Sequence, residues 1–445
     1  MLLIVRGRLF FLNKMIKIGV IGGSGLDDPK ILENFEERQV ETNYGMPSSK
    51  IICGKIGNAE VFILARHGKK HEIVPSQINF RANIAALKKV GCAIILASSA
   101  VGSLKEEIIP GDLVFPDQIV DFTKQRKSSF HDSGEVIHLP FAEPFSEKIR
   151  KILIETSQDL GLKHHPDSTL VVIEGPRFST RAESFFFKTF AEIIGMTTMP
   201  EAALAREAGI EYATVAMATD YDCWRENTAA VTFELVRERM EENSEKVKKL
   251  FIEVIIKIGE DEMNREHKEF IKSKIRTVPN FPKPGIMFRD ITTLLKDADG
   301  FTKTINLLEE RYKNKEIDLI AGIESRGFVI ASALASKLGK GLVLIRKPGK
   351  LPGEKEREEY DLEYGKDAVE IHKDAISPGQ KVLLVDDLIA TSGTLIGACN
   401  LVKKVGGDIV ECGVIVELEE LCGRKKLQNM GISVFSLVKF KESEE

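Results

Sequence analysis

Short apolar runs alternate with amphipathic, charge-flanked stretches along the whole chain. The runs are rich in β-branched residues and have the length of buried strands; they lie at residues 16–21, 61–65, 93–97, 169–173, 319–321, 342–345, 382–385 and 410–416. Between them, apolar residues recur at helical spacing, as in residues 145–160, where Gly161 marks a helix end. This alternation predicts an α/β architecture in which helices cover mostly parallel sheets.

The composition changes near the middle of the chain. Residues 259–274 are highly charged and residues 278–285 are rich in proline, so we place a domain boundary at about residue 260. The predicted organisation is an extension over residues 1–14, a first domain over 15–260, and a second over 261–445 that begins with a charged helix. No internal repeat relates the halves, which indicates a fusion of two different units.

The first fourteen residues are apolar but are interrupted by Arg6, Arg8 and Lys14. A secretory signal needs an uncharged apolar stretch and a small-residue cleavage site, and this segment has neither. We predict that it is a disordered extension, or that it lies upstream of a true start at Met15.

Composition excludes several classes of protein. Hydrophobic residues make up 43% and charged residues 29%, which excludes a disordered or fibrous chain. The 63 basic and 67 acidic residues nearly balance, and no apolar run approaches the ~20 residues of a membrane span, so neither nucleic acid nor a membrane is an expected partner. The six cysteines form no C-x-x-C pair and show no zinc spacing. They predict free thiols in a reducing compartment, the cytoplasm.

Three polar loops follow strands of the first half. They are Gly22-Gly23-Ser24-Gly25, Arg66-His67-Gly68 and Ser98-Ser99-Ala100. Glycines let a backbone approach an anion, Arg66 offers a bidentate guanidinium, and His67 offers a second donor. Asp28 stands where a dinucleotide fingerprint needs glycine. Each loop alone is more often a simple turn, but together, at the carboxyl ends of strands, they predict an oxyanion site.

Residues 16–258 resemble S-methyl-5′-thioadenosine phosphorylase, a member of the purine nucleoside phosphorylase family. The similar motifs are residues 22–27, 65–68, 174–179, 196–201 and 218–224. The resemblance implies an α/β domain with a mixed sheet that cleaves methylthioadenosine with phosphate, giving adenine and 5-methylthioribose 1-phosphate. Phosphate is itself the nucleophile, so no metal or cofactor is expected.

The resemblance also assigns residues to this reaction. The phosphate-binding set is Ser24, Arg66, His67, Ser99 and Thr197. The nucleoside-binding set is Ala100, Phe178, Met196, Asp220, Asp222 and His138, the last reaching into a neighbouring subunit. Asp220 and Asp222 are the expected catalytic pair, because a carboxyl group among apolar neighbours can stay protonated and donate to adenine N7.

The first half departs from the family in two respects. Ser24 and Ser99 stand where many relatives have Thr, and the family's C-terminal helix, which helps to close the methylthio pocket, has no clear counterpart before the linker. A purine nucleoside phosphorylase with broader base or 5′ specificity therefore remains the alternative.

In the second half, a buried strand ends in Asp386-Asp387 and runs into a turn rich in hydroxyls. The N–H groups of such a turn suit a monophosphate at a helix N-terminus. The two carboxylates suit a ribose diol or Mg²⁺.

Residues 266–440 resemble adenine phosphoribosyltransferase of the type I phosphoribosyltransferase family. The similar motifs are residues 281–291, 322–328, 346–353, 362–365 and 381–394. The resemblance implies an α/β domain with a mostly parallel sheet, which uses Mg²⁺ and converts adenine and phosphoribosyl pyrophosphate into AMP and pyrophosphate. No direct protein ligand of a metal is predicted.

The resemblance assigns residues here as well. The adenine-binding set is Met287, Phe288 and Arg289. The pyrophosphate-binding set is Ser325, Arg326, Arg346, Lys347 and Lys350. The ribose-5-phosphate set is Asp386, Asp387, Ala390, Thr391, Ser392, Gly393 and Thr394. Residues 354–359 match a mobile, charged lid on which Glu363 is the candidate base, and Ser392 stands where relatives usually have Gly.

The product of the first reaction is a substrate of the second. The sequence therefore predicts a bifunctional enzyme of purine salvage. The alternative for the second half is a non-catalytic module that senses purine or phosphoribosyl pyrophosphate. Relatives of the first half are trimers and relatives of the second are dimers, so we expect a homo-oligomer, with a hexamer if both interfaces persist.

Overall fold

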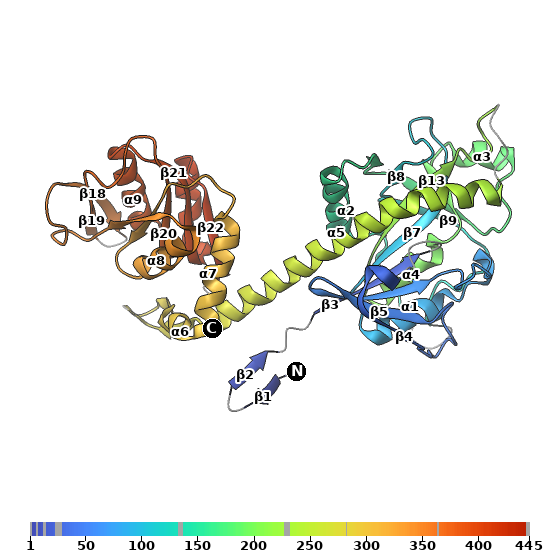
Figure 1. The fold of residues 1–445 in the computed structure, drawn as a ribbon, viewed down its shortest axis with the longest axis horizontal. Coiled ribbons are helices and arrows are strands. Elements are labelled where there is room, and N and C mark those ends of the chain that lie inside the picture. Colours follow the sequence, from blue (N-terminus) through green and yellow to red (C-terminus); the bar gives the residue numbers. More distant parts are fainter. Residues whose placement is uncertain are drawn as a thin grey trace. The chain divides into compact units, whose positions relative to one another are not determined.

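The computed structural model describes residues 2–5, 8–11, 15–22, 29–131, 137–226, 232–281, 283–362 and 365–441. The chain divides into two compact units, unit 1 (Met1–Met263) and unit 2 (Asn264–Glu445). The division falls within the long helix α5, Phe233–Ser273 (Figure 1). No described helix carries an uncharged apolar stretch long enough to cross a lipid bilayer.

Unit 1 contains a mixed sheet, as predicted. Within the described residues its strands run in the order β10-β8-β13-β7-β3-β6-β5-β4, and β12, β11 and β9 continue from β7. The central strands β6, β3, β7 and β13 are parallel, whereas β4, β5 and β6 pair antiparallel. The strands are β3 (Ile16–Gly22), β4 (Glu33–Arg38), β5 (Ile51–Ile56), β6 (Ala59–Ala65), β7 (Ile94–Ser103), β8 (Leu113–Val114), β9 (Gln118–Phe122), β10 (His164–His165), β11 (Thr169–Ile173), β12 (Ile193–Gly195) and β13 (Glu211–Asp220).

Helices cover both faces of this sheet. They are α1 (Phe80–Val90), α2 (Glu147–Asp159), α3 (Arg181–Phe187), α4 (Thr198–Glu207) and α5. Side chains alternate across each strand, so Ile95 and Ala97 of β7 share a core with α1 and α4, while Ile94 and Leu96 share another with α2 and α5. The part of α5 in unit 1 buries an apolar stripe at helical spacing, comprising Val247, Leu250, Phe251, Val254, Ile255 and Ile258.

Unit 2 contains a parallel five-stranded sheet in the order β17-β16-β20-β21-β22, also as predicted. Its strands are β16 (Leu319–Ile323), β17 (Gly341–Ile345), β20 (Lys381–Ile389), β21 (Asp408–Leu418) and β22 (Val434–Phe440). Two antiparallel hairpins accompany it, β14 (Arg276–Pro279) with β15 (Met287–Asp290), and β18 (Lys355–Leu362) with β19 (Gly365–His372). The helices are α6 (Thr292–Lys296), α7 (Ala298–Tyr312), α8 (Arg326–Leu338), α9 (Gly393–Lys404) and α10 (Gly423–Asn429).

The sheet of unit 2 is also covered on both faces. Leu383 and Val385 of β20 pack in one core with α7 and α8, and Val382 and Leu384 pack in the other with α9. The carboxyl ends of the parallel strands β16, β17 and β20 therefore meet at one edge of the sheet, where ligands of open α/β sheets bind.

Three segments differ from the sequence-based expectations. The charged stretch expected to open the second domain is the last part of α5, a helix that begins in unit 1, and unit 2 starts within this stretch at Asn264. The charged segment 354–359, expected as a mobile lid, lies in and just before strand β18, where Tyr360 is buried against Gly397 of α9 and Lys404 bonds Glu356 at 2.9 Å. Near the N-terminus, β1 (Leu2–Val5) and β2 (Arg8–Phe11) pair as a hairpin that the sequence analysis did not predict.

Candidate active sites

A cavity of about 840 Å³ opens in unit 1 where the parallel strands β6, β7 and β13 end. Most of the residues predicted for the phosphorylase site line it: Arg66, His67, Ser99, Ala100, Phe178, Met196, Thr197, Asp220 and Asp222. His138 is exposed and is not among the lining residues. Ser24 lies outside the described residues.

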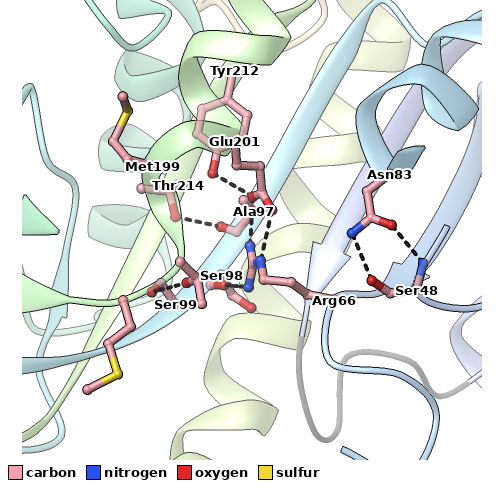
Figure 2. A network of polar contacts seen from close by, with 12 residues as sticks. Ser48, Arg66, Asn83, Ala97, Ser98, Ser99, Met199, Glu201, Tyr212 and Thr214 are labelled. Carbon is pink, nitrogen blue, oxygen red and sulfur yellow. Dashed lines mark hydrogen bonds and ion pairs between the residues drawn. The ribbon is translucent and has the colours of Figure 1, made fainter. Parts of the chain in front are cut away.

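One end of the cavity carries hydroxyl groups and a buried guanidinium (Figure 2). Ser99 Oγ on β7 lies 3.0 Å from Thr197 Oγ1, at the residue that precedes α4. The Ser98 hydroxyl, also buried in this wall, has no partner among the described residues. Arg66 follows β6, and its Nη1 donates to the Ser98 carbonyl at 2.7 Å. Such a cluster of donors suits an oxyanion.

Two residues to which the sequence analysis gave no role hold this guanidinium. Glu201 of α4 accepts from Arg66 Nε at 2.8 Å and from Nη2 at 2.7 Å, and the Tyr212 hydroxyl donates to Glu201 at 2.8 Å (Figure 2). The side chains of Arg66 and Glu201 are 3% and 0% exposed. Glu201 therefore occupies the Nε–Nη2 edge of Arg66, so the bidentate contact with a ligand that the sequence analysis expects cannot use that edge. The side chains lie far apart in sequence, so no local pattern pairs them.

His67 stands beside Arg66 in the cavity wall. Its Nδ1 lies 2.8 Å from the carbonyl oxygen of Ile73, and its ring stacks on His71 with 4.4 Å between centroids. Burial, opposed by the bond to Ile73, lowers the pKa of His67 to about 4. The ring is therefore neutral at physiological pH. A carbonyl only accepts, so Nδ1 bears the proton and Nε2 is an acceptor, contrary to the donor role expected from the sequence.

The cavity lining also includes two buried carboxyl groups. Asp220 ends β13 and accepts from Thr219 Oγ1 and from the Asp222 N–H, both at 2.7 Å. Burial raises the pKa of Asp220 against these two bonds, and burial also raises the pKa of Asp222. Gly102 packs closely against this carboxyl group, because a Cβ at that position would lie 3.0 Å from Asp220 Oδ1. Both carboxyl groups are thus biased toward their protonated forms.

Apolar side chains complete the cavity. Met196 is held by Arg126, whose Nη1 donates to the Met196 carbonyl at 2.7 Å and to the Met199 carbonyl at 2.6 Å. The first turns of α5 contribute Val236 and Met240. A helix of this half thus lines the cavity, whereas the sequence analysis found no clear counterpart of the family's C-terminal helix. This contact could not be predicted from the sequence, because many residues of α5 are charged and only a few of its side chains line the cavity.

In unit 2, the acidic pair and the predicted adenine residues lie close together. Asp386 and Asp387 are buried in β20, and Arg326 forms an ion pair with Asp387 while lying 5.4 Å over the Phe288 ring. A Cβ on Gly327 would lie 2.9 Å from Asp386 Oδ1, so the first turn of α8 packs tightly on β20. Burial and the neighbouring Asp387 raise the pKa of Asp386 well above its usual range. These acids sit where a bound cation or hydrogen-bond donor relieves their repulsion.

The basic residues predicted for pyrophosphate surround Glu324, which the sequence analysis gave no role. Glu324 accepts from Lys350 Nζ at 2.7 Å, from the Lys347 N–H at 3.0 Å and from Arg346 Nε at 3.2 Å. Burial raises the pKa of Glu324, but these donors prevail and lower it to about 2. Ser325 precedes α8 beside this cluster, and Lys347 Nζ also pairs with Asp367.

Two predicted residues of unit 2 are placed differently from the rest. Arg289 is buried on β15, where its guanidinium bonds Thr277 and the Lys441 carbonyl and lies 4.4 Å over the Phe440 ring; Met287 on the same strand is half-buried. Ser392 has φ +72° at the start of α9, in the turn that contains Ala390, Thr391, Gly393 and Thr394. Glu363 lies outside the described residues.

Among the described residues, no group of three or more His, Cys, Asp or Glu side chains forms a metal cluster.

Comparison with known proteins agrees with this architecture. Residues 17–256 match the phosphorylase superfamily and residues 290–444 match the phosphoribosyl transferase domain. The chain therefore belongs to the phosphorylase superfamily, and a phosphoribosyltransferase domain follows in unit 2.

The relatives that match unit 1 are S-methyl-5′-thioadenosine phosphorylases. The Danio rerio protein is 48% identical over 272 residues, covering 59% of this chain and 97% of the relative; the Xenopus tropicalis protein is 49% identical over 251 residues, covering 55% and 89%. The solved structure of methylthioadenosine phosphorylase from Schistosoma mansoni with adenine is 40% identical, covers 55% of this chain and 92% of that chain, and superposes with a TM-score of 0.53.

Proposed function

We propose that unit 1 cleaves S-methyl-5′-thioadenosine with phosphate. The observation that carries the proposal is a single cavity whose lining combines hydroxyl groups, a buried guanidinium and two buried carboxyl groups. The printed names of the relatives support the same reaction. The anion end suits the attacking phosphate, and the carboxyl end suits a departing purine.

Each group then has a defined part in the reaction. Ser99 and Thr197 hold phosphate beside Arg66 so that one oxygen faces C1′ of the ribose. As the bond between C1′ and adenine N9 breaks, its electron pair moves into the purine, and protonated Asp220 donates to N7 to neutralise it. The phosphate oxygen then bonds C1′. Ser24 is part of the same proposed phosphate set, and Phe178 and Met196 flank the nucleoside.

The cavity also favours an apolar 5′ group. Val236 and Met240 of α5 face the same cavity as Ile73 and Val74. A methylthio group gains from burial against such side chains, whereas a 5′ hydroxyl loses its water there. Adenosine is the second candidate substrate, because a Schistosoma mansoni relative is titled adenosine/methylthioadenosine phosphorylase.

The test for unit 1 is chromatography of reactions with methylthioadenosine, adenosine or inosine, each with and without phosphate. We expect adenine from methylthioadenosine only when phosphate is present, and little product from inosine. Comparable rates with all three nucleosides would contradict the proposed specificity.

For unit 2 we propose transfer of phosphoribose to adenine, which gives AMP. The proposal is supported by the proximity of Phe288, Arg326 and Asp387 and by the basic cluster Arg346, Lys347 and Lys350. The turn at residues 390–394 suits the 5′-phosphate, because it opens α9 at its N-terminus. Glu363 is the proposed base at adenine N9.

Mg²⁺ fits the donors of unit 2. Asp386 and Asp387 place oxygen ligands in a buried position where burial and mutual repulsion disfavour two free charges. When bound with the diphosphate, Mg²⁺ neutralises negative charge on the leaving pyrophosphate. The test is conversion of adenine and phosphoribosyl pyrophosphate to AMP, with Mg²⁺ or with a chelator. IMP from hypoxanthine or GMP from guanine, formed as fast as AMP from adenine, would contradict adenine as the base.

A further inference from the structure

His67 offers an acceptor, not a donor, to the anion end of the unit 1 cavity. Its Nδ1 bears the proton that bonds the Ile73 carbonyl at 2.8 Å, so Nε2 of the neutral ring has a lone pair. No donor from the described residues reaches Nε2. The ring lines the cavity next to Arg66.

The neighbouring cation is already balanced. Glu201 pairs with Arg66 at 2.7 Å inside the protein, and Ser99 and Thr197 are neutral donors. The other charged or titratable groups near His67 or around the same cavity are Lys69, Lys70, His71, Glu72, Asp220, Asp222 and Arg237. Lys69, Lys70, His71, Glu72 and Arg237 are exposed, so solvent screens them. The binding of an anion beside His67 therefore depends on whether the anion itself carries a proton.

We propose that His67 Nε2 accepts the proton of hydrogen phosphate, so that this site selects oxyanions that carry a proton at neutral pH and disfavours sulfate. This inference rests on the proposed phosphorolysis and adds the chemical form of its nucleophile. The O–H of hydrogen phosphate donates to Nε2 and no proton enters from solvent. Sulfate has the same shape and charge but no hydrogen, so its oxygen faces a lone pair unless the protein first takes up one proton.

Uptake of a proton by His67 is unfavourable at neutral pH. Burial is the main reason that its pKa lies at about 4. The pKa is lowered, so the proton needed for sulfate is increasingly scarce as pH rises. The dissociation constant for sulfate should therefore rise about tenfold for each pH unit above this pKa, whereas that for hydrogen phosphate should not.

The decisive experiment is calorimetric titration of the full chain with inorganic phosphate and with sodium sulfate at about pH 8, in buffers of different ionisation enthalpy. We expect uptake of about one proton per bound sulfate and of nearly none per bound phosphate. Equal proton uptake for the two anions, or a sulfate dissociation constant that does not change with pH, would overturn the inference.

A pair of variants locates the effect. His67→Gln places an amide donor near the position of Nε2 at every pH, so it should remove the pH dependence of sulfate binding and tighten that binding at high pH. His71→Gln, in the stacked neighbour, should keep the pH dependence. If His67→Gln does not fold, the proton balance of the unsubstituted chain still decides.

Failure of the proposed function has a separate signature. A chain that shows the expected proton balance but releases no adenine from methylthioadenosine would refute the phosphorolysis and leave the anion selectivity standing. A chain that releases adenine but binds sulfate without proton uptake would refute the selectivity alone.

Discussion

At the scale of single residues, the buried carboxyl groups of Glu201, Asp220 and Asp222 have two different roles in unit 1. Glu201 meets the guanidinium of Arg66 and the hydroxyl of Tyr212, so its charge is balanced inside the protein. Asp220 and Asp222 meet no such cation among the described residues, and burial raises the pKa of both. The same residue chemistry therefore supports an ion pair at one end of the cavity and acids at the other.

The role of Asp220 predicts the effect of Asp220→Asn. Phosphorolysis of methylthioadenosine should fall about 10²-fold, because the amide cannot deliver a proton to N7. Because the folded-state pKa of Asp220 is raised and the protonated form acts, the unsubstituted enzyme should lose activity as pH rises through that pKa. Kinetic profiles of kcat/KM against pH should show this alkaline limb in the parent and not in the variant. An identical limb in both would contradict the role.

The buried pair predicts a large stability effect for Glu201→Gln. Removal of one partner leaves the Arg66 charge unbalanced in the interior, which should cost roughly 3–5 kcal/mol. The chain has one Trp, and Trp224 is buried in unit 1, so its fluorescence during denaturation follows that unit. Asp159→Asn, which breaks the exposed pair with Lys257, is the control and should change stability by less than about 1 kcal/mol.

Ser392 predicts a stabilising substitution in unit 2. Its φ of +72° suits glycine, and its buried hydroxyl has no partner among the described residues. Ser392→Gly should therefore stabilise unit 2 by about 1 kcal/mol, whereas Ser332→Gly, inside helix α8, should destabilise it by a similar amount. Hydrogen exchange of the β20 amides measures both. Destabilisation by Ser392→Gly would contradict the proposal that serine is strained at this positive φ.

At the scale of elements, the strands and the loops after them could be read from the sequence. The β-branched runs became β3, β6, β7, β11, β16, β17, β20 and β21. The loop after β6 and the last residues of β7 and β13 supply the cavity, so Ser98, Ser99 and Ala100, which were expected in a loop, lie within β7. The length of α5 and the β18–β19 hairpin could not be read, because both are charged on their solvent faces and depend on packing against distant segments. The partners Glu201 and Glu324 were missed for the same reason.

The position of α5 predicts a substrate effect for Met240→Gln. A polar side chain at this wall should lower kcat/KM for methylthioadenosine relative to adenosine by about tenfold, because it removes apolar contact with the 5′ substituent. Met263→Gln, on the same helix but outside the cavity lining, is the control. The ratio of kcat/KM for methylthioadenosine to kcat/KM for adenosine measures the effect. An unchanged ratio would show that α5 does not contact the 5′ substituent.

At the scale of the whole molecule, one chain carries two units whose proposed reactions share adenine. The chain makes both units in equal amounts, so every adenine released by unit 1 has a corresponding site in unit 2. Their association in one chain supports each assignment, since a phosphorylase that releases adenine and a transferase that consumes it form consecutive steps. This account requires that both sites act in the same protein.

The most direct measurement follows base-labelled methylthioadenosine through the full chain with phosphate, phosphoribosyl pyrophosphate and Mg²⁺. We predict labelled AMP in the complete reaction and labelled adenine when phosphoribosyl pyrophosphate is omitted. Asp220→Asn should slow the formation of both products from the nucleoside about 10²-fold yet form AMP from added adenine at the parent rate. Labelled adenine that accumulates without AMP in the complete reaction would contradict the account of unit 2, and no adenine in either reaction would contradict that of unit 1.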